Sequence, residues 1–288
     1  MKKILTLIIA LMAAALLAAP TLSAQNWLEV PQVQNTPWQH VVRTATMSDP
    51  ATGKEIRNFT YAYAPAAGVS LWVAYPLNRG LIGEGNRTDA WDFDPDLPQN
   101  VQRVLYKSFG GDEHEHFDRG HQIPSGDRLS PKANRRTFAF TNIAPQDPTL
   151  NGGLWNDLEQ RVRSWAKRSD TLYVVTGVLL EGTRTVSDND GNAVTVPSHF
   201  WKTVLRKNTD KYGRVHWSMC AVVLANVPRR SRGFKEAGPV LRNESIPVKS
   251  LERYTGLEFF PELKKIIGEE EYLKLKAAHP LNENWWWN

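Results

Sequence analysis

Cysteine is almost absent from this sequence: its 288 residues include one, Cys220, in the apolar run WSMCAVVLANV. A single cysteine excludes an internal disulfide, so the fold must depend on packing. The sequence also lacks internal repeats and low-complexity linkers, and nothing in it marks a boundary between two folded domains. The formal net charge is only +5, and Lys2 and Lys3 contribute part of it. Attraction to a polyanion would therefore have to come from local basic clusters.

The longest apolar run lies at the N-terminus. It extends from residue 4 to residue 19, follows two lysines, and is succeeded by Pro20 and the small residues Ser23 and Ala24. This order is typical of a secretory signal peptide cleaved after Ala24. The alternative is an uncleaved membrane anchor, but the run is short for a span of about 20 residues. We expect residues 1–24 to be removed, leaving a periplasmic or secreted protein with no membrane attachment.

The remaining chain mixes strand and helix signals. Residues 25–57 are polar and are expected to be irregular, whereas 58–65 and 70–77 are aromatic and β-branched runs typical of a hairpin. Apolar residues at helical spacing predict a helix over 154–168. Further strands are expected at 137–146, 172–180, 199–207 and 215–227, and further helices at 246–260 and 261–276. Because strands and helices are interspersed without regular βαβ alternation, the fold class is predicted to be α+β.

One histidine stands in an unusual context. Residues 116–128 read HFDRGHQIPSGDR, and His121 has charged, glycine and proline neighbours, as in a loop or strand end that displays functional groups. Asn151 follows in TLNGGLW, and Glu159 lies farther along the expected helix, one turn after Trp155. Asn151 could simply be a helix cap or turn residue, but its amide oxygen is also a hard ligand suited to Mg²⁺.

Read together, DRGHQIPSGDR and the downstream TNIAPQDPTLNGGLWNDLE resemble the DNA/RNA non-specific endonucleases. This family includes secreted bacterial nucleases and mitochondrial endonuclease G, and its active site is of the ββα-metal type. The segments VVTGVLLEG, VPSHFWKTVL and IPVKSLERYTGLEFF extend the resemblance, in the same order, over about residues 58–263. The resemblance implies one endonuclease domain over residues 58–288, with a central antiparallel sheet flanked by helices, preceded by an N-terminal extension at 25–57.

The resemblance also implies roles for particular residues. His121 fills the position of the general base, and a neutral histidine with a pKa near ~6.5 can take a proton from water at neutral pH. Asn151 matches the direct protein ligand of a single Mg²⁺, which Mn²⁺ can replace, and Glu159 matches a carboxylate that orients the waters of the metal. Arg119 and Asn142 match residues that contact the phosphate or support the site.

A further arginine is implied on an earlier loop, where the family stabilises the pentacovalent phosphate. Arg87 in GEGNRTDAWDFDP is the candidate, and the alternative is a solvated loop arginine. Asp118 is expected to hold the backbone or Arg119 in place, because a carboxylate beside the scissile phosphate would repel it.

The stretch DEHEH at 112–116 offers a competing metal site. With His121 it places three histidines and several carboxylates within a short segment, a composition that could bind Zn²⁺. If this segment were a strand, His114 and His116 would point to opposite faces, so a polar loop is favoured.

Three other features could contact a polyanion or belong to the ordinary surface. The basic pairs and runs at 135–136 and 229–232 could be solvated, and Trp285, Trp286 and Trp287 could stack on bases or pack on the domain.

The sequence therefore predicts an exported Mg²⁺-dependent endonuclease that hydrolyses DNA and RNA and leaves 5′-phosphate ends. Contacts to backbone phosphates would give little sequence preference. Two alternatives are a nucleic-acid-binding protein with little catalysis and a zinc metallohydrolase that uses the 112–121 cluster.

Overall fold

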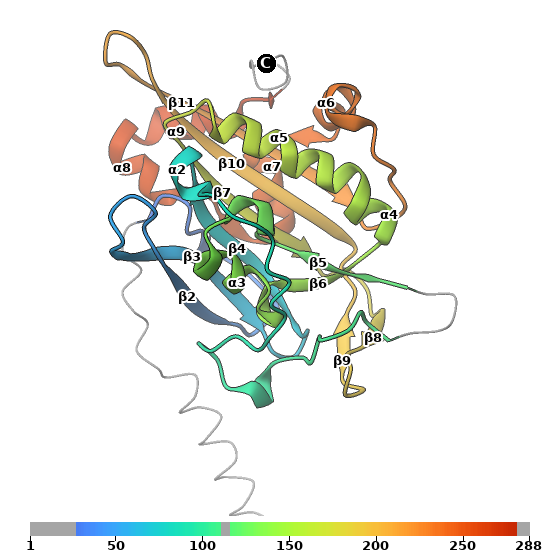
Figure 1. Ribbon diagram of the computed structural model, residues 1–288. Coiled ribbons are helices and arrows are strands. Elements are labelled where there is room, and N and C mark those ends of the chain that lie inside the picture. Colours follow the sequence, from blue (N-terminus) through green and yellow to red (C-terminus); the bar gives the residue numbers. More distant parts are fainter. Residues whose placement is uncertain (1–26, 111–115, 281–288) are drawn as a thin grey trace, which may run out of the picture.

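The computed structural model describes residues 27–110 and 116–280, and a seven-stranded sheet forms its centre (Figure 1). Every neighbouring pair of strands in this sheet is antiparallel. In spatial order the strands are β12 (Ser245–Ile246), β11 (Val215–Ala225), β10 (His199–Thr209), β7 (Thr171–Leu179), β4 (Val69–Leu77), β3 (Glu55–Ala64) and β2 (Val41–Ser48). The α+β class and the central antiparallel sheet are confirmed.

The central strands are buried on both faces, which explains their nearly continuous apolar sequences. Successive residues of β4 point to opposite sides: Val73 and Tyr75 belong to one core cluster, and Trp72 and Ala74 to the other. Burial of each large apolar side chain contributes roughly 1.5–3 kcal/mol relative to exposure. Packing in two hydrophobic cores, one on each face of the sheet, therefore stabilises this fold without a disulfide.

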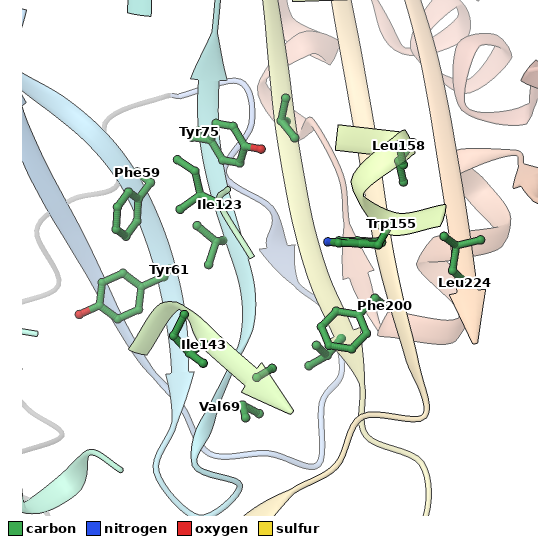
Figure 2. Close-up of a cluster of buried hydrophobic side chains, with 14 of the residues drawn as sticks. Phe59, Tyr61, Val69, Tyr75, Ile123, Ile143, Trp155, Leu158, Phe200 and Leu224 are labelled. Atoms are coloured by element: carbon green, nitrogen blue, oxygen red, sulfur yellow. The ribbon is translucent and has the colours of Figure 1, made fainter. Parts of the chain in front are cut away.

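Helices cover both faces. The first cluster contains Trp155 and Leu158 from the region of α5 (Asn156–Ala166), together with Phe200 of β10 (Figure 2). The second cluster contains Leu251 and Tyr272, which come from helices on the opposite face. The remaining helices are α2 (Arg79–Ile82), α3 (Pro131–Thr137), α4 (Pro148–Leu150), α6 (Gly233–Asn243), α7 (Val248–Thr255), α8 (Lys264–Ile267) and α9 (Glu269–Ala277).

A two-stranded sheet packs on the first cluster, and its second strand leads into α5. Strand β5 (Asp118–His121) pairs antiparallel with β6 (Ile143–Gln146), with His121 opposite Ile143. Ile143 of β6 and Ile123, two residues after the end of β5, are fully buried in the first cluster (Figure 2). After β6 the chain passes through α4 and a π-helical segment, η4 (Asn151–Trp155), into α5. Two strands and a helix thus lie in succession on one face of the sheet.

The smaller elements lie outside the seven-stranded sheet. Two-stranded sheets are formed by β1 (Gln32–Val33) with β13 (Leu257–Glu258), and by β8 (Thr185–Ser187) with β9 (Ala193–Thr195). Short 3₁₀ segments are η1 (Gln99–Val101), η2 (Ser125–Asp127), η3 (Phe140–Asn142) and η5 (Pro261–Leu263).

Two local expectations are wrong. Residues 25–57 are not irregular, because β2 forms an edge strand of the main sheet and β3 already begins at Glu55. Because β2 lies at the edge of the sheet, it is half-exposed and its sequence VVRTATMS is partly polar. A polar sequence does not indicate a strand, so β2 was not predicted. Residues 137–146 are not one strand either: Phe140–Asn142 is a 3₁₀ turn, and only Ile143–Gln146 is extended.

The strands expected at 172–180, 199–207 and 215–227 are present as β7, β10 and β11. The helix expected at 246–260 is shorter, because α7 ends at Thr255, Gly256 is left-handed and β13 follows. The helix expected at 261–276 is interrupted at Gly268, between α8 and α9. The hairpin at 58–65 and 70–77 is confirmed, as is the helix at 154–168, which the structure places at Asn156–Ala166. Within the described part of the chain, no helix is long and apolar enough to cross a membrane. The expected signal peptide lies outside the described residues, and the domain boundaries at 24/25 and 57/58 stay predictions.

Candidate active site

His121 ends strand β5 between two aromatic rings. The centroid of its imidazole lies 5.2 Å from that of Trp91 and 5.0 Å from that of Phe138. Its Nε2 atom is shielded from solvent and has no hydrogen-bond partner among the described residues. Burial, with the positive charge of Arg87 as the next contribution, lowers the pKa of His121 to about 3. At neutral pH the imidazole is therefore uncharged, and Nε2 has no partner in the part of the chain that the structure describes.

Arg87 is held next to this histidine by three contacts. Its Nε lies 2.8 Å from Oδ1 of Asp89, and its Nη1 donates a hydrogen bond of 3.2 Å to Oγ of Ser125. Its guanidinium carbon lies 4.7 Å from the centroid of the Phe138 ring, the same ring that packs on His121. The side chain remains 49% exposed, so it is anchored but still accessible to a ligand.

Arg119 lies on the other aromatic neighbour of His121. Its guanidinium carbon is 3.7 Å from the centroid of the Trp91 ring, and its Nη1 donates to the carbonyls of Leu105 (3.0 Å) and Tyr106 (2.7 Å). A cation stacked on an indole at this distance is attracted to the face of the ring. Arg119 therefore fixes Trp91, and through it the position of the imidazole.

Asn142 has its side-chain groups satisfied inside the protein. Its Oδ1 accepts from the backbone N of Ile123 at 3.0 Å, and its Nδ2 donates to the carbonyls of Ile123 (2.9 Å) and Thr137 (2.7 Å). The residue is 1% exposed. Of the two roles expected for Asn142, this geometry fits support of the segment that follows β5, and it leaves little for direct contact with a phosphate.

Asn151 is tied to the same strand as His121. Its Nδ2 donates a hydrogen bond of 2.9 Å to Oδ2 of Asp118, the first residue of β5. With its amide nitrogen held this way, Oδ1 is the remaining acceptor, and it makes no hydrogen bond within the described ranges. Asp118 therefore has a partner that the sequence did not indicate, and its charge also acts on Arg119.

A break in helical geometry lies directly after Asn151. Gly153 has φ −108° and ψ −120°, and Asn151–Trp155 is π-helical. A Cβ at Gly153 would lie 2.2 Å from the carbonyl oxygen of Arg229, so only glycine fits there. The second glycine of TLNGGLW is thus a packing requirement that fixes how α5 begins.

Glu159 is half-buried on α5, near positive side chains. Burial raises the pKa of its carboxyl to about 7, against the opposing charges of Arg163 and Lys202. Lys202 is 2% exposed, and its Nζ has no hydrogen-bond partner within 27–110 and 116–280. This Nζ lies 5.0 Å from the centroid of the Trp155 ring. Burial lowers the pKa of Lys202 to about 8, and the charge of Glu159 opposes this shift.

The same buried network extends to Asp127. Its Oδ1 lies 2.9 Å from Nη1 of Arg163, and its Oδ2 accepts from the hydroxyl of Tyr75 at 2.9 Å. Sequence reasoning missed Lys202, Asp127 and Arg163. The available signals were a lysine inside the otherwise apolar HFWKTVL and an arginine one helical turn after Glu159.

The alternative metal site is mostly outside the described residues. Of the DEHEH stretch only His116 is described, and its Nε2 lies 3.7 Å from Oδ1 of Asp118 with the side chain 66% exposed. Within 27–110 and 116–280, no group of three or more histidine, cysteine, aspartate or glutamate side chains could hold a metal ion. His114 and the tail residues Trp285, Trp286 and Trp287 lie outside the described ranges.

Comparison with known proteins gives consistent matches. Residues 43–266 match the family model described as DNA/RNA non-specific endonuclease. The chain is 32% identical over 221 residues to mitochondrial endonuclease G of Bos taurus, covering 73% of this chain and 69% of that protein. It is 31% identical over 234 residues to mitochondrial nuclease EXOG of Homo sapiens, covering 75% of this chain and 60% of the relative. The match therefore spans less than two thirds of the length of EXOG.

A bacterial protein and a solved structure are also similar. A nuclease of Nostoc sp. is 30% identical over 231 residues, which cover 78% of this chain and 79% of that protein. The solved structure is titled as the EndoG/EndoGI complex and the mechanism of EndoG inhibition. It superposes with a TM-score of 0.55 at 25% identity, covering 76% of this chain and 86% of that chain.

Proposed function

Because the chain belongs to the DNA/RNA non-specific endonuclease family, we propose that it hydrolyses phosphodiester bonds of DNA and RNA with little sequence preference, leaving 5′-phosphate ends. The observation that carries this proposal is the organisation of β5. One end of the four-residue strand presents the uncharged His121, and the other end, through Asp118, orients the amide of Asn151. A candidate base and a candidate metal ligand are thereby held by one short strand.

The family is generally metal-dependent, and the donor groups here suit a hard divalent cation. We propose Mg²⁺, with Mn²⁺ able to replace it. Asn151 would hold the ion through Oδ1, since its Nδ2 is already bonded to Asp118. Glu159 would orient waters of the ion, because Mg²⁺ keeps several waters and needs few protein ligands. When bound, the ion supplies stabilisation of the charge that develops on the phosphate and the departing 3′-oxygen.

His121 is the general base in this proposal. Its low pKa keeps it unprotonated at neutral pH, so its free nitrogen can accept a proton from the attacking water. Arg87 would contact the scissile phosphate, because it is anchored beside His121 and still half-exposed. Arg119 acts as a positioning residue through its stacking on Trp91. Asn142 supports the backbone after β5.

Substrate choice and location complete the proposal. A phosphate-directed site reads the backbone and not the base edges, so both DNA and RNA would be substrates. The signal-like segment at 1–24 supports export to the periplasm or the medium.

Digestion of plasmid DNA and of RNA by purified residues 25–288 tests the proposal. Cleavage of both with Mg²⁺, its loss with a chelator and its return on adding Mg²⁺ are expected. The products should accept a 5′ label from polynucleotide kinase only after phosphatase treatment. Binding without cleavage would leave a nucleic-acid-binding protein, and rescue by Zn²⁺ alone would favour the metallohydrolase alternative.

A further inference from the structure

The loop between β11 and α6 carries the basic run Arg229-Arg230-Ser231-Arg232, to which the catalytic proposal assigns no role. This loop lines an open groove with a volume of about 640 Å³, together with Thr149, Leu154 and Val240. Arg230 and Arg232 are exposed to solvent. The groove is therefore accessible and strongly basic.

The loop is fixed to the segment that carries the candidate metal ligand. The backbone N of Leu154 donates to the carbonyl of Arg229 at 3.0 Å, and the absence of a side chain at Gly153 permits this close approach. Oγ of Ser231 and the backbone N of Arg232 bond to the carboxylate of Asp157, at 2.8 and 2.9 Å. Figure 1 shows the loop running beside α4 and the start of α5. The backbone of this loop is thus fixed to Leu154 and Asp157, which follow Asn151 closely in the sequence.

The charges of this loop are only partly neutralised. Arg229 pairs with Glu244, and the carboxylate of Asp157 is occupied by Ser231 and by the backbone of Arg232. The side chains of Arg230 and Arg232 make no hydrogen bond and no ion pair with any described residue. The exposed guanidinium groups of Arg230 and Arg232 add positive charge to the groove, and this charge favours an anion there.

We infer that this groove binds phosphates of the nucleic-acid strand that extends from the scissile bond, through Arg230 and Arg232. The inference rests on the proposed function and adds a substrate preference to it. The groove selects long nucleic-acid strands over short phosphodiesters. Guanidinium groups pair with phosphate oxygens in a forked geometry. A strand contacted on consecutive phosphates gains affinity that is independent of sequence and depends on salt.

The test compares two doubly substituted proteins, each lacking two positive charges. One is Arg230→Ala with Arg232→Ala. The control is Lys249→Ala with Arg253→Ala, both exposed on α7 at the opposite face of the sheet. Binding of a long single-stranded DNA is measured against salt in a His121→Ala background, so that cleavage does not interfere. Circular dichroism and thermal unfolding verify folding, and Arg230→Lys with Arg232→Lys tests whether charge alone restores binding.

We expect the loop variant to lower the slope of log affinity against log salt by about 1.4, and to weaken binding roughly tenfold at physiological salt. The control and the lysine variant should retain a slope near that of the parent. In the active protein the loop variant should raise KM more for long than for short oligonucleotides. Equal slopes in loop variant and control would overturn the inference, as would binding of the parent to anionic vesicles but not to DNA.

The binding assay separates this inference from the proposed function. If the parent binds DNA through the groove but cleaves nothing, the catalytic proposal fails and the groove stands. If the parent cleaves DNA and the slopes do not differ, only the groove is refuted.

Discussion

Asp118 accepts a hydrogen bond of 2.9 Å from the side-chain nitrogen of Asn151, which joins the first residue of β5 to the segment that begins α5. This contact sets which end of the amide points away from the strand. His121 lies at the other end of the same strand. The two groups on which the proposed chemistry depends are therefore positioned by a single four-residue element.

Replacing this aspartate should weaken the metal site without removing the ligand. In Asp118→Ala the amide of Asn151 loses its orienting partner, and loss of such an outer contact costs about 10–100-fold in metal affinity. We expect weaker Mg²⁺ binding by calorimetry and nicking activity that partly recovers at high Mg²⁺. Unchanged Mg²⁺ affinity in the folded variant would refute this role of Asp118.

The two glycines after Asn151 should respond differently to substitution. In Gly153→Ala the new Cβ would meet the carbonyl of Arg229 at 2.2 Å, whereas at Gly152 nothing lies within 4 Å. Forcing extra volume into a packed site costs about 1–3 kcal/mol. Urea unfolding should show this loss for Gly153→Ala, with a matching loss of nicking, and little change for Gly152→Ala. Equal stability of the two variants would contradict the packing account.

His121 should reduce stability under mildly acidic conditions. Its pKa is about 3 in the folded protein and about 6.5 in an unfolded chain. Between these values the unfolded state binds a proton that the folded state does not, so stability falls as pH falls below about 6.5. His121→Asn should remove this term. At about pH 5 the wild type should have lost roughly 1–2 kcal/mol more than the variant, relative to neutral pH. Parallel curves of unfolding free energy against pH would exclude a buried, neutral His121.

Lys202 should control the pH at which Glu159 becomes charged. Removing the buried cation in Lys202→Met leaves the carboxylate less stabilised, so the pKa of Glu159 should rise above its value of about 7. The acidic limb of the kcat/KM profile should then move to higher pH. Lys207→Met, near the other end of the same strand, is the matched control. A profile that does not move, or that moves to lower pH, would show that Lys202 does not act on Glu159.

How much of the site could be predicted from sequence depended on how local each signal was. The contiguous DRGH and TLNGGLW motifs indicated His121, Arg119 and Asn151 as candidate site residues. The central strands could be predicted because burial on both faces makes their sequences apolar. The polar edge strand β2 was missed because half of its surface is exposed. Lys202 was missed for the opposite reason: one charge in an apolar strand gains meaning only from Glu159 and Trp155, which come from another element.

Some details needed three-dimensional contacts. The family resemblance implied Arg87 only as an arginine on an earlier loop, and its proximity to His121 comes from the Phe138 ring that both residues contact. From the sequence alone, Asn142 could contact a phosphate or support the site. Its side chain makes three hydrogen bonds within the protein, and these favour support. The catalytic and metal-binding roles of the site residues stay predictions, and mutagenesis tests them.

The central claim is that His121 is the base of a phosphodiester hydrolysis, and plasmid nicking by His121→Ala in Mg²⁺ tests it most directly. Nicking rates are compared with those of the wild type, with DNA binding and Mg²⁺ affinity measured in parallel. The account predicts a loss of at least ~10²–10⁴-fold in turnover, the range typical of a missing general base, with both binding steps retained. Near-wild-type nicking by a clean preparation of His121→Ala would contradict it.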